Sequence, residues 1–359
     1  MKEVASYYLK EGMVLARNVT TPSGQIIFKK GKTLSKQAIL QLTFYNIQSV
    51  FIEGEEEDQL DSPSAVKSYS QKIKTSQKFQ SFQIDHTIVL SQMRVSFEGY
   101  VNNGIPLDTK LLVSKVEELF DSCKTSLELF NMLHNMHSSD DSVYGHSLNV
   151  SLICRQIGKW SKLDAGAVEL LTLAGLLHDI GKLKIPAEIL NKPGKYTDEE
   201  YALVKQHTQY SYDLLEPLNL DPHVKMAALS HHERCDGSGY PSGLKNDEID
   251  VVARVVTIAD VYDAMTTARS YRAPLCPFEV IEKFEREGLQ RYDAKFILTF
   301  LNHIANTYQN HRILLSDGRS ANIVMLNSKQ LSKPIVQLDD GSCLDLYTAS
   351  GGLHIQAVL

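Results

Sequence analysis

The stretch HHERCDGSGYP, residues 231–241, is the most informative part of this 359-residue chain. Two adjacent histidines precede a glycine-broken loop that carries a tyrosine, and this combination suits a metal and phosphate site better than core packing. Upstream, HDIGK at 178–182 follows directly on the apolar run 170–177. Together the two stretches predict a metal-dependent phosphohydrolase.

Imidazole and carboxylate side chains spread along this part of the chain are the candidate metal ligands. The long spacings between them allow different helices to supply them, since a helical bundle can project ligands inward from facing helices. A lone histidine is more often a structural or surface residue, but the coincidence of so many pieces favours a metal site. The candidates are His146, His178, Asp179, His207, His231, His232 and Asp260.

The ligand types indicate which metals to expect. Mixed nitrogen and oxygen ligands suit iron, manganese, zinc or nickel, whereas a closed structural zinc site more often uses cysteines. We expect two divalent ions, iron or manganese first, with zinc and nickel as alternatives. Asp179 is suited to bridge them, and two ions about 3.5–4 Å apart would activate a water and stabilise the attacking and leaving oxygens of a phosphodiester.

Composition limits the class of protein. With 43% hydrophobic residues, the chain can bury a sizeable core and form two or three domains. Its five cysteines lack any C-x-x-C spacing, which argues against a disulfide framework and favours a reducing, cytoplasmic setting. No apolar run approaches the roughly 20 residues that cross a bilayer. A net charge of −6 disfavours long nucleic acid, so a small nucleotide is the expected partner.

The pattern along the chain predicts a mainly α protein with small β-rich ends. Strand and turn signals near the beginning surround one helix that starts after Ser35. Apolar residues at steps of four and three between 116 and 130 predict a helical stripe that either packs in the core or forms a homodimer contact. The expected segments are a small β-rich domain at 1–53, a linker and mixed segment at 54–107, a connecting helix at 108–139, a helical catalytic domain at 140–309 and a small β-rich domain at 310–359.

Local signals predict several boundaries inside these segments. Thr197 and Glu200 fit a capping box, which marks the start of a helix. The stretches 317–318 and 339–341 carry Asp-Gly turn signals, which are typical of β-hairpins. We therefore expect a new helix after Thr197 and two hairpins near the end of the chain.

The region from about residue 140 to 300 resembles the HD-GYP family. This is the bacterial branch of the HD phosphohydrolases, whose described members hydrolyse cyclic dinucleotides, chiefly cyclic di-GMP. The resemblance implies an HD-type helical bundle as the catalytic domain. It is carried by HSLNV at 146–150, HDIGK at 178–182, LNKPGK at 190–195, His207, the stretch 231–241, IADV at 258–261 and RSYR at 269–272.

The family's functional residues, carried over position by position, imply a phosphodiesterase for cyclic di-GMP. All the candidate ligands would bind the metals, and a metal-bridging hydroxide would attack phosphorus to give pGpG, GMP or both. Asp179 and Lys182 would be the catalytic residues. Lys182, Arg269 and Arg272 resemble phosphate contacts, because nearby cations neutralise the scissile phosphate. Tyr240 resembles a residue that meets the nucleotide.

Several positions depart from the family's pattern. Ser142 stands where some members have a glutamate that adds a third metal, which supports a two-metal centre. Ala268, Ala273 and Cys235 replace an acidic residue, a lysine and a tryptophan that are common there, so cyclic GMP-AMP stays open as the substrate. Glu233 is interpreted as orienting a ligand imidazole, serving as a base or stabilising a helix. A slow or non-catalytic cyclic-dinucleotide sensor, or a hydrolase of another nucleotide, is the alternative.

Overall fold

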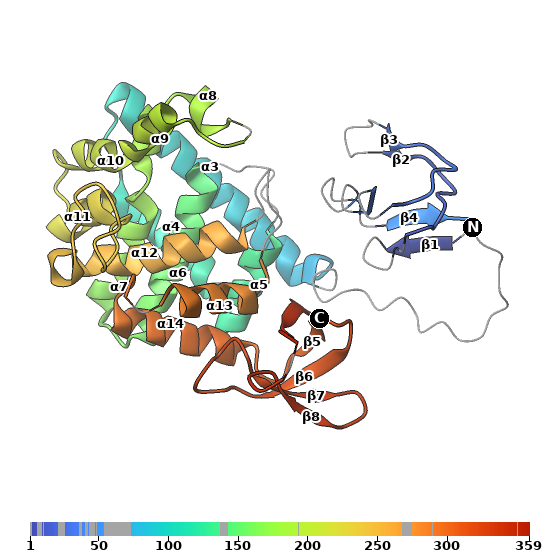
Figure 1. Ribbon diagram of the computed structural model, residues 1–359. Helices are drawn as coiled ribbons and strands as arrows, with labels where there is room; N and C mark the ends of the chain where they lie inside the picture. Colours follow the sequence, from blue (N-terminus) through green and yellow to red (C-terminus); the bar gives the residue numbers. More distant parts are fainter. Residues whose placement is uncertain are drawn as a thin grey trace. The chain divides into compact units, whose positions relative to one another are not determined.

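The chain forms two compact units, residues 1–66 and residues 67–359 (Figure 1). Helices dominate the second unit, so the predicted mainly α fold with small β-rich parts is confirmed. The computed structural model describes residues 2–5, 9, 11–20, 26–35, 38–39, 42, 47, 49–53, 73–136, 143–192, 194–267, 275–288, 290–349 and 351–359.

The first unit contains two antiparallel pairs of strands. Their core includes Leu15, Leu34 and Leu42, which are fully buried. Ser35 Oγ accepts a hydrogen bond from the backbone N–H of Ala38 at 3.2 Å, as expected for the residue that caps the following helix. The pairs are β1 (Lys2–Ala5) with β4 (Ser49–Ile52), and β2 (Val19–Thr20) with β3 (Ile26–Phe28).

A long helix, α3 (Gln77–Asn103), occupies much of the region that we predicted as a linker and mixed segment. The prediction of a mixed segment did not specify this helix, and residues 54–72 lie outside the described residues. Apolar side chains on the solvent side of α3 obscure its amphipathic period: Ile84, Ile88 and Val95 are all at least half exposed. The helix begins at Ser76, whose Oγ accepts from the backbone N–H of Phe79.

The predicted connecting helix at 108–139 is two helices, α4 (Thr109–Asp121) and α5 (Ser126–Asn135). The break arises because the Thr125 side chain caps α5 by accepting from the backbone N–H of Glu128. Val116, Phe120 and Phe130 are buried in the core of the unit, which supports core packing of the stripe. A homodimer contact through this region stays a prediction.

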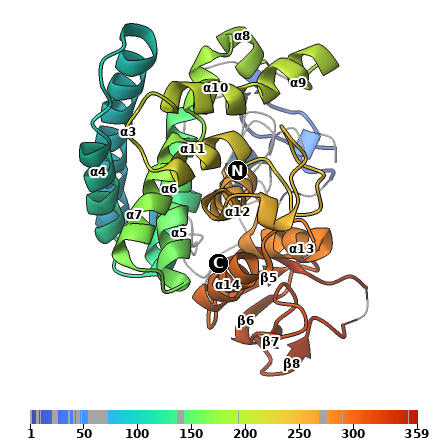
Figure 2. The same ribbon diagram turned by 90° about the vertical axis from the view of Figure 1, so that its left-hand side faces the viewer.

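The remaining helices form the bundle that carries the candidate ligands. Helix α6 is buried along most of its length and packs against α7 and α12. Helices α3 and α4 lie side by side at one edge of the bundle (Figure 2). The predicted capping box of Thr197 and Glu200 is confirmed at the start of α9. The elements are α6 (Val143–Trp160), α7 (Ala165–Leu177), η2 (Ile180–Lys184), α8 (Ala187–Leu190), α9 (Asp198–Lys205), α10 (His207–Leu215), α11 (Pro222–Ser230), η3 (Asn246–Glu248), α12 (Val251–Thr266), α13 (Pro277–Glu287) and α14 (Ala294–Thr307).

The chain ends in an antiparallel sheet of strand order β8-β7-β6-β5-β9. Both predicted hairpins are present, joining β5 to β6 and β7 to β8. Ile313, Leu315 and Val336 of the sheet belong to the same hydrophobic core as the helices. In the part of the chain that the structure describes, no helix has the length and apolar character to cross a membrane. The strands are β5 (Arg312–Leu315), β6 (Ser320–Met325), β7 (Ile335–Leu338), β8 (Cys343–Asp345) and β9 (Ile355–Val358).

Candidate metal centre

The bundle brings all seven predicted ligands together in two groups. Within each group the ligand atoms lie within 4.8 Å of one another. They come from the ends and turns of different helices: the first turn of α6, the junction of α7 and η2, the start of α10, the end of α11 and the middle of α12. One group is Asp179, His207, His231 and His232, and the other is His146, His178 and Asp260.

Asp179 lies between the two groups and presents one oxygen to each. Its Oδ1 is 3.2 Å from Nε2 of His207 and 3.6 Å from Nε2 of His231. Its Oδ2 is 3.3 Å from Nε2 of His178 and 3.5 Å from Nε2 of His146. A carboxylate in this position can bridge two ions, as the sequence predicted.

Asp260 serves the second group from α12. Its Oδ1 lies 3.0 Å from Nε2 of His146, and its Oδ2 lies 3.7 Å from Nδ1 of His232. Both carboxylates therefore approach Nε2 of His146, so that a cation bound there would meet both nitrogen and oxygen ligands.

Backbone carbonyls fix the ring orientation of three ligand histidines. Nδ1 of His178 lies 2.8 Å from the carbonyl oxygen of Gly175, and Nδ1 of His207 lies 2.6 Å from that of Val204. Nδ1 of His231 lies 3.0 Å from the carbonyl oxygen of Ala228. Since a carbonyl only accepts, each Nδ1 carries the proton and each Nε2 keeps a lone pair directed into the centre.

The electrostatics hold most of these groups in the protonation states that a metal requires. His146 is the exception: burial lowers its pKa, but the neighbouring Asp260 and Asp263 raise it to about 9, so a bound cation would displace a proton from this imidazole. Burial alone would raise the pKa of Asp179, but Lys182 and the neighbouring His178 hold it well below its usual range. Burial lowers the pKa of His231 to about 4, and it lowers that of His232 well below the ordinary value. Metals bind ionised carboxylates and neutral imidazoles, so this centre is prepared for a cation.

The contacts inside the centre fit a divalent metal better than a hydrogen-bond network. His178 Nε2 and Asp179 Oδ1 are buried and make no hydrogen bond with any of the residues that the structure describes, although both face polar neighbours. Nε2 of His207 and Nε2 of His231 lie 3.4 Å apart. Since both Nδ1 atoms donate to backbone carbonyls, neither Nε2 carries a proton, and the two cannot form a hydrogen bond with each other. Buried polar atoms without partners are costly, and coordination to a cation would satisfy them. The His/Asp cluster can therefore hold divalent metal.

Lys182 and Tyr240 lie beside the candidate ligands, while their predicted contacts with substrate stay predictions. The ammonium of Lys182 contacts Asp179 Oδ2 from the next turn of η2. The ring of Tyr240 stacks on His232 with 4.6 Å between centroids. Arg269 and Arg272, the other predicted phosphate contacts, lie outside the described residues.

Glu233 has a role that the sequence did not predict. Its carboxylate is buried and accepts hydrogen bonds from the backbone N–H groups of Ser242, Gly243 and Leu244 at 2.7–3.1 Å. It therefore anchors the loop that follows Tyr240, and none of its hydrogen bonds goes to a ligand imidazole. Our interpretation of Glu233 as a group orienting a ligand imidazole was therefore wrong, whereas a role as a base stays a prediction.

The sequence reasoning missed two further residues beside the centre. Asp263 Oδ2 lies 2.7 Å from Nδ1 of His146, and its spacing of three from Asp260 on α12 was an available signal. Lys205 Nζ lies 5.0 Å from the ring centroid of Tyr201 and 5.9 Å from that of Tyr240. This cation near the aromatic edge of the centre could meet a phosphate, but a lysine on a polar helix carries no specific signal in sequence.

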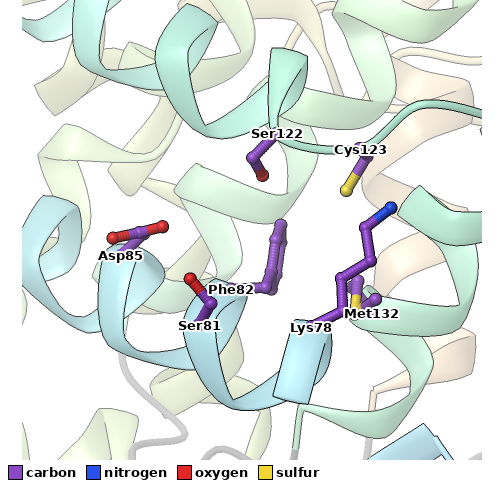
Figure 3. A pocket seen from close by; sticks show the side chains of 7 residues that line it. All are labelled: Lys78, Ser81, Phe82, Asp85, Ser122, Cys123 and Met132. Atoms are coloured by element: carbon purple, nitrogen blue, oxygen red, sulfur yellow. The ribbon is translucent and has the colours of Figure 1, made fainter. Parts of the chain in front are cut away.

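A small pocket elsewhere in the bundle does not belong to the centre. It lies between α3, the α4–α5 turn and α5, and its volume of about 60 Å³ would hold a water or two rather than a nucleotide (Figure 3). None of the candidate ligands lines it. The lining residues are Lys78, Ser81, Phe82, Asp85, Ser122, Cys123 and Met132.

Known proteins with similar sequences include cyclic-dinucleotide phosphodiesterases. A cyclic di-GMP phosphodiesterase of Pseudomonas aeruginosa is 33% identical over 66% of this chain and 57% of its own length. A 3'3'-cGAMP-specific phosphodiesterase of Vibrio cholerae is 36% identical over 50% of this chain and 42% of its own length. A solved HDG"Y"P protein from Bdellovibrio bacteriovorus is 18% identical, covering 84% of this chain and 99% of its own, with a TM-score of 0.48.

This chain spans about half the length of the curated relatives it matches. The family model described as HD domain matches residues 128–296, the segment that contains every candidate ligand. The resemblance to the HD-GYP family that the motifs predicted is thereby confirmed, in that residues 128–296 match the HD domain model and the relatives are cyclic-dinucleotide phosphodiesterases by name.

Proposed function

We propose that this chain is a metal-dependent phosphodiesterase that hydrolyses cyclic di-GMP to pGpG, GMP or both. The observation that carries the proposal is the position of Asp179, whose two oxygens face two separate groups of imidazoles while Lys182 contacts the same carboxylate. A buried carboxylate shared in this way is suited to hold a pair of ions. The names of the relatives from Pseudomonas and Vibrio support a cyclic dinucleotide as the substrate.

The residues that would hold the metals are the two groups around Asp179 and Asp260. When bound, two divalent ions would supply an activated water and neutralise charge on the phosphoryl oxygens. Iron and manganese are our first choices, with zinc and nickel as alternatives, because the ligands mix imidazole nitrogen with carboxylate oxygen.

The chain's own side chains would bind and orient the substrate. Lys182 would neutralise the scissile phosphate, since its ammonium already lies at the edge of the centre. Tyr240 would offer its ring to a guanine base, and its stacking on His232 holds that ring beside the centre. Arg269 and Arg272 are proposed as further phosphate contacts on the basis of the sequence resemblance.

The decisive experiment is anaerobic incubation of manganese- or iron-loaded protein with cyclic di-GMP. Products are resolved by chromatography, and metals per chain are counted in the same sample. We expect pGpG or GMP at many turnovers with about two ions per chain. Tight binding at one equivalent without product would contradict an enzyme and favour the sensor alternative.

A second substrate is supported by a specific observation, because two of the relatives are named as specific for 3'3'-cGAMP. The two cyclic dinucleotides differ in one base, so competition between them in one preparation compares kcat/KM directly. A larger kcat/KM for 3'3'-cGAMP would keep the reaction and replace the substrate.

The two-metal assignment has its own test in Asp179→Ala. This change removes the carboxylate that both groups share, and we expect loss of most bound metal together with activity. Retention of both ions and of normal turnover would contradict the dinuclear centre.

A further inference from the structure

A line of buried hydrogen bonds runs from the ligand His146 to a helix outside the matched HD segment. Nδ1 of His146 lies 2.7 Å from Asp263 Oδ2. The other oxygen of Asp263 accepts hydrogen bonds from Asn149 Nδ2 and from Thr267 Oγ1, both at 2.9 Å, and Asn149 Oδ1 lies 3.3 Å from Nε2 of His86. His86 belongs to α3, which ends at Asn103 and therefore lies wholly before residues 128–296.

Each bond in this line determines the state of the next group. Because the carboxylate of Asp263 accepts, the proton of His146 stays on Nδ1, and its Nε2 faces Asp179 and Asp260. Asn149 must then direct its NH₂ group toward Asp263 and its oxygen away. A donor on the oxygen side fixes that orientation, and Nε2–H of His86 provides it.

The burial of His86 indicates that this bond matters. Every residue of α3 is described, and His86 is the one polar side chain on its buried face, among Phe82, Val89 and Met93. A buried polar group costs free energy unless it is hydrogen-bonded, so an apolar residue would pack there at lower cost. Burial also lowers the pKa of His86, which keeps the ring neutral. The Asn149 bond is the interaction that a leucine at this position could not make.

We propose that His86 is a positioning residue for the metal centre. It holds the amide of Asn149 in the orientation that lets Asp263 direct the ring of His146 toward the metal. Among the described residues, the hydrogen bond of His86 goes to Asn149 and not to a ligand atom. The inference rests on the metal centre of the proposed function and is independent of the substrate, so metal binding alone can test it.

The test is titration of metal-free protein with Mn²⁺. The affinity for each ion is measured by calorimetry and by the electron paramagnetic resonance signal of the free ion. His86→Leu should weaken one of the two ions, the one held by His146, at least about tenfold, because partners that orient a ligand typically contribute that much to affinity. The protein should keep its affinity for the other ion within about twofold, because the line of hydrogen bonds does not include the ligands of that ion.

Two variants at the same position separate reach from burial. His86→Gln places an amide N–H within reach of Asn149 and should restore affinity. The side chain of asparagine is too short to reach Asn149, so His86→Asn should weaken the same ion about tenfold. This polar variant serves as the test if His86→Leu fails to fold. In the background of Asn149→Ala, His86→Leu should cause no further loss, because both changes break the same line of bonds.

Val89→Ala is the matched control, since Val89 is buried on the same face of α3 but lies outside this line. It should lower the melting temperature without changing either affinity. The inference is overturned if His86→Leu binds both ions like the unsubstituted protein, or if Val89→Ala weakens metal binding as much as His86→Leu does. Failure of the unsubstituted protein to bind Mn²⁺ would overturn the metal centre and this inference together, whereas metal binding without hydrolysis would leave the inference intact and refute only the enzyme.

Discussion

Gly181→Ala should disable the metal centre by steric displacement. Gly181 lies in η2 directly beneath α10, and a Cβ at this position would sit 2.2 Å from the carbonyl oxygen of His207 and 2.3 Å from the backbone nitrogen of Ser211. The Gly181 N–H also donates to Ser211 Oγ at 2.9 Å. The obstacles are mostly backbone atoms, so no side-chain rotation can relieve the clash.

The size of the displacement follows from these distances. Real Cβ atoms essentially never approach another atom closer than 3.0 Å, so η2 and the start of α10 must separate by at least 3.0 − 2.2 = 0.8 Å, and by 3.4 − 2.2 = 1.2 Å to reach ordinary van der Waals contact. His207 is the first residue of α10, and its Nε2 now lies 3.2 Å from Asp179 Oδ1. A misplacement of about 1 Å in a catalytic constellation can cost about a hundredfold in rate. Overpacking should also lower the free energy of unfolding by about 1–3 kcal/mol.

The assay measures kcat with cyclic di-GMP and bound metal per chain at a temperature where urea denaturation shows the variant to be folded. Gly99→Ala is the control, because its new Cβ would meet no atom closer than 3.4 Å. We expect Gly99→Ala to retain metal and rate. A folded Gly181→Ala variant with full metal content and unchanged kcat would refute the argument that close backbone approach positions His207.

Three further outcomes are expected. Lys182→Ala should keep both metals and lose about a hundredfold in kcat, because Lys182 contributes charge beside Asp179 without being a ligand; unchanged kinetics would remove it from the mechanism. Lys205→Met should raise KM for cyclic di-GMP about tenfold, the worth of one charged contact, while KM for bis(p-nitrophenyl) phosphate stays constant. Burial lowers the pKa of His134 from 6.5 to about 4 against the opposing charge of Asp263, so its stabilising contribution is complete above pH 6.5 and is lost as the pH falls toward 4. Urea denaturation should show about 2 kcal/mol lost from this group between pH 7 and pH 5, and His134→Gln should abolish that part of the pH dependence.

Four of the candidate ligands could be predicted from sequence because they stand in short patterns with their own chemistry. HDIGK and the paired histidines mark His178, Asp179, His231 and His232, and the remaining ligands follow from the family resemblance. Only a few residue types bind metals, so the ligands can be recognised from the sequence. The capping box and the hairpin turns were predictable for the same reason, since local geometry restricts which residues can occupy them.

What the sequence could not predict depends on contacts between distant residues. Asn149 and Asp263 meet across 114 residues, and His86 and Asn149 meet across 63. No periodicity or motif indicates which buried polar side chains will pair over such separations. Glu233 shows the same limit, because its partners are backbone N–H groups of a loop whose path is set only in the folded protein. Helix α3 was missed because exposed apolar residues such as Val95 blur its amphipathic period.

The helix that was missed also changes what the functional unit must be. The matched HD segment begins at residue 128, yet Met93 and Phe97 of α3 are fully buried in the same hydrophobic core as the helices that carry the ligands. Ile313 and Val336 of the terminal sheet join that core from the other end of the chain. A core is close-packed and transmits strain, so elements on both sides of the HD segment help to fix the positions of α6 and α12. The geometry of the metal centre is therefore a property of the whole second unit, residues 67–359, rather than of the HD segment alone.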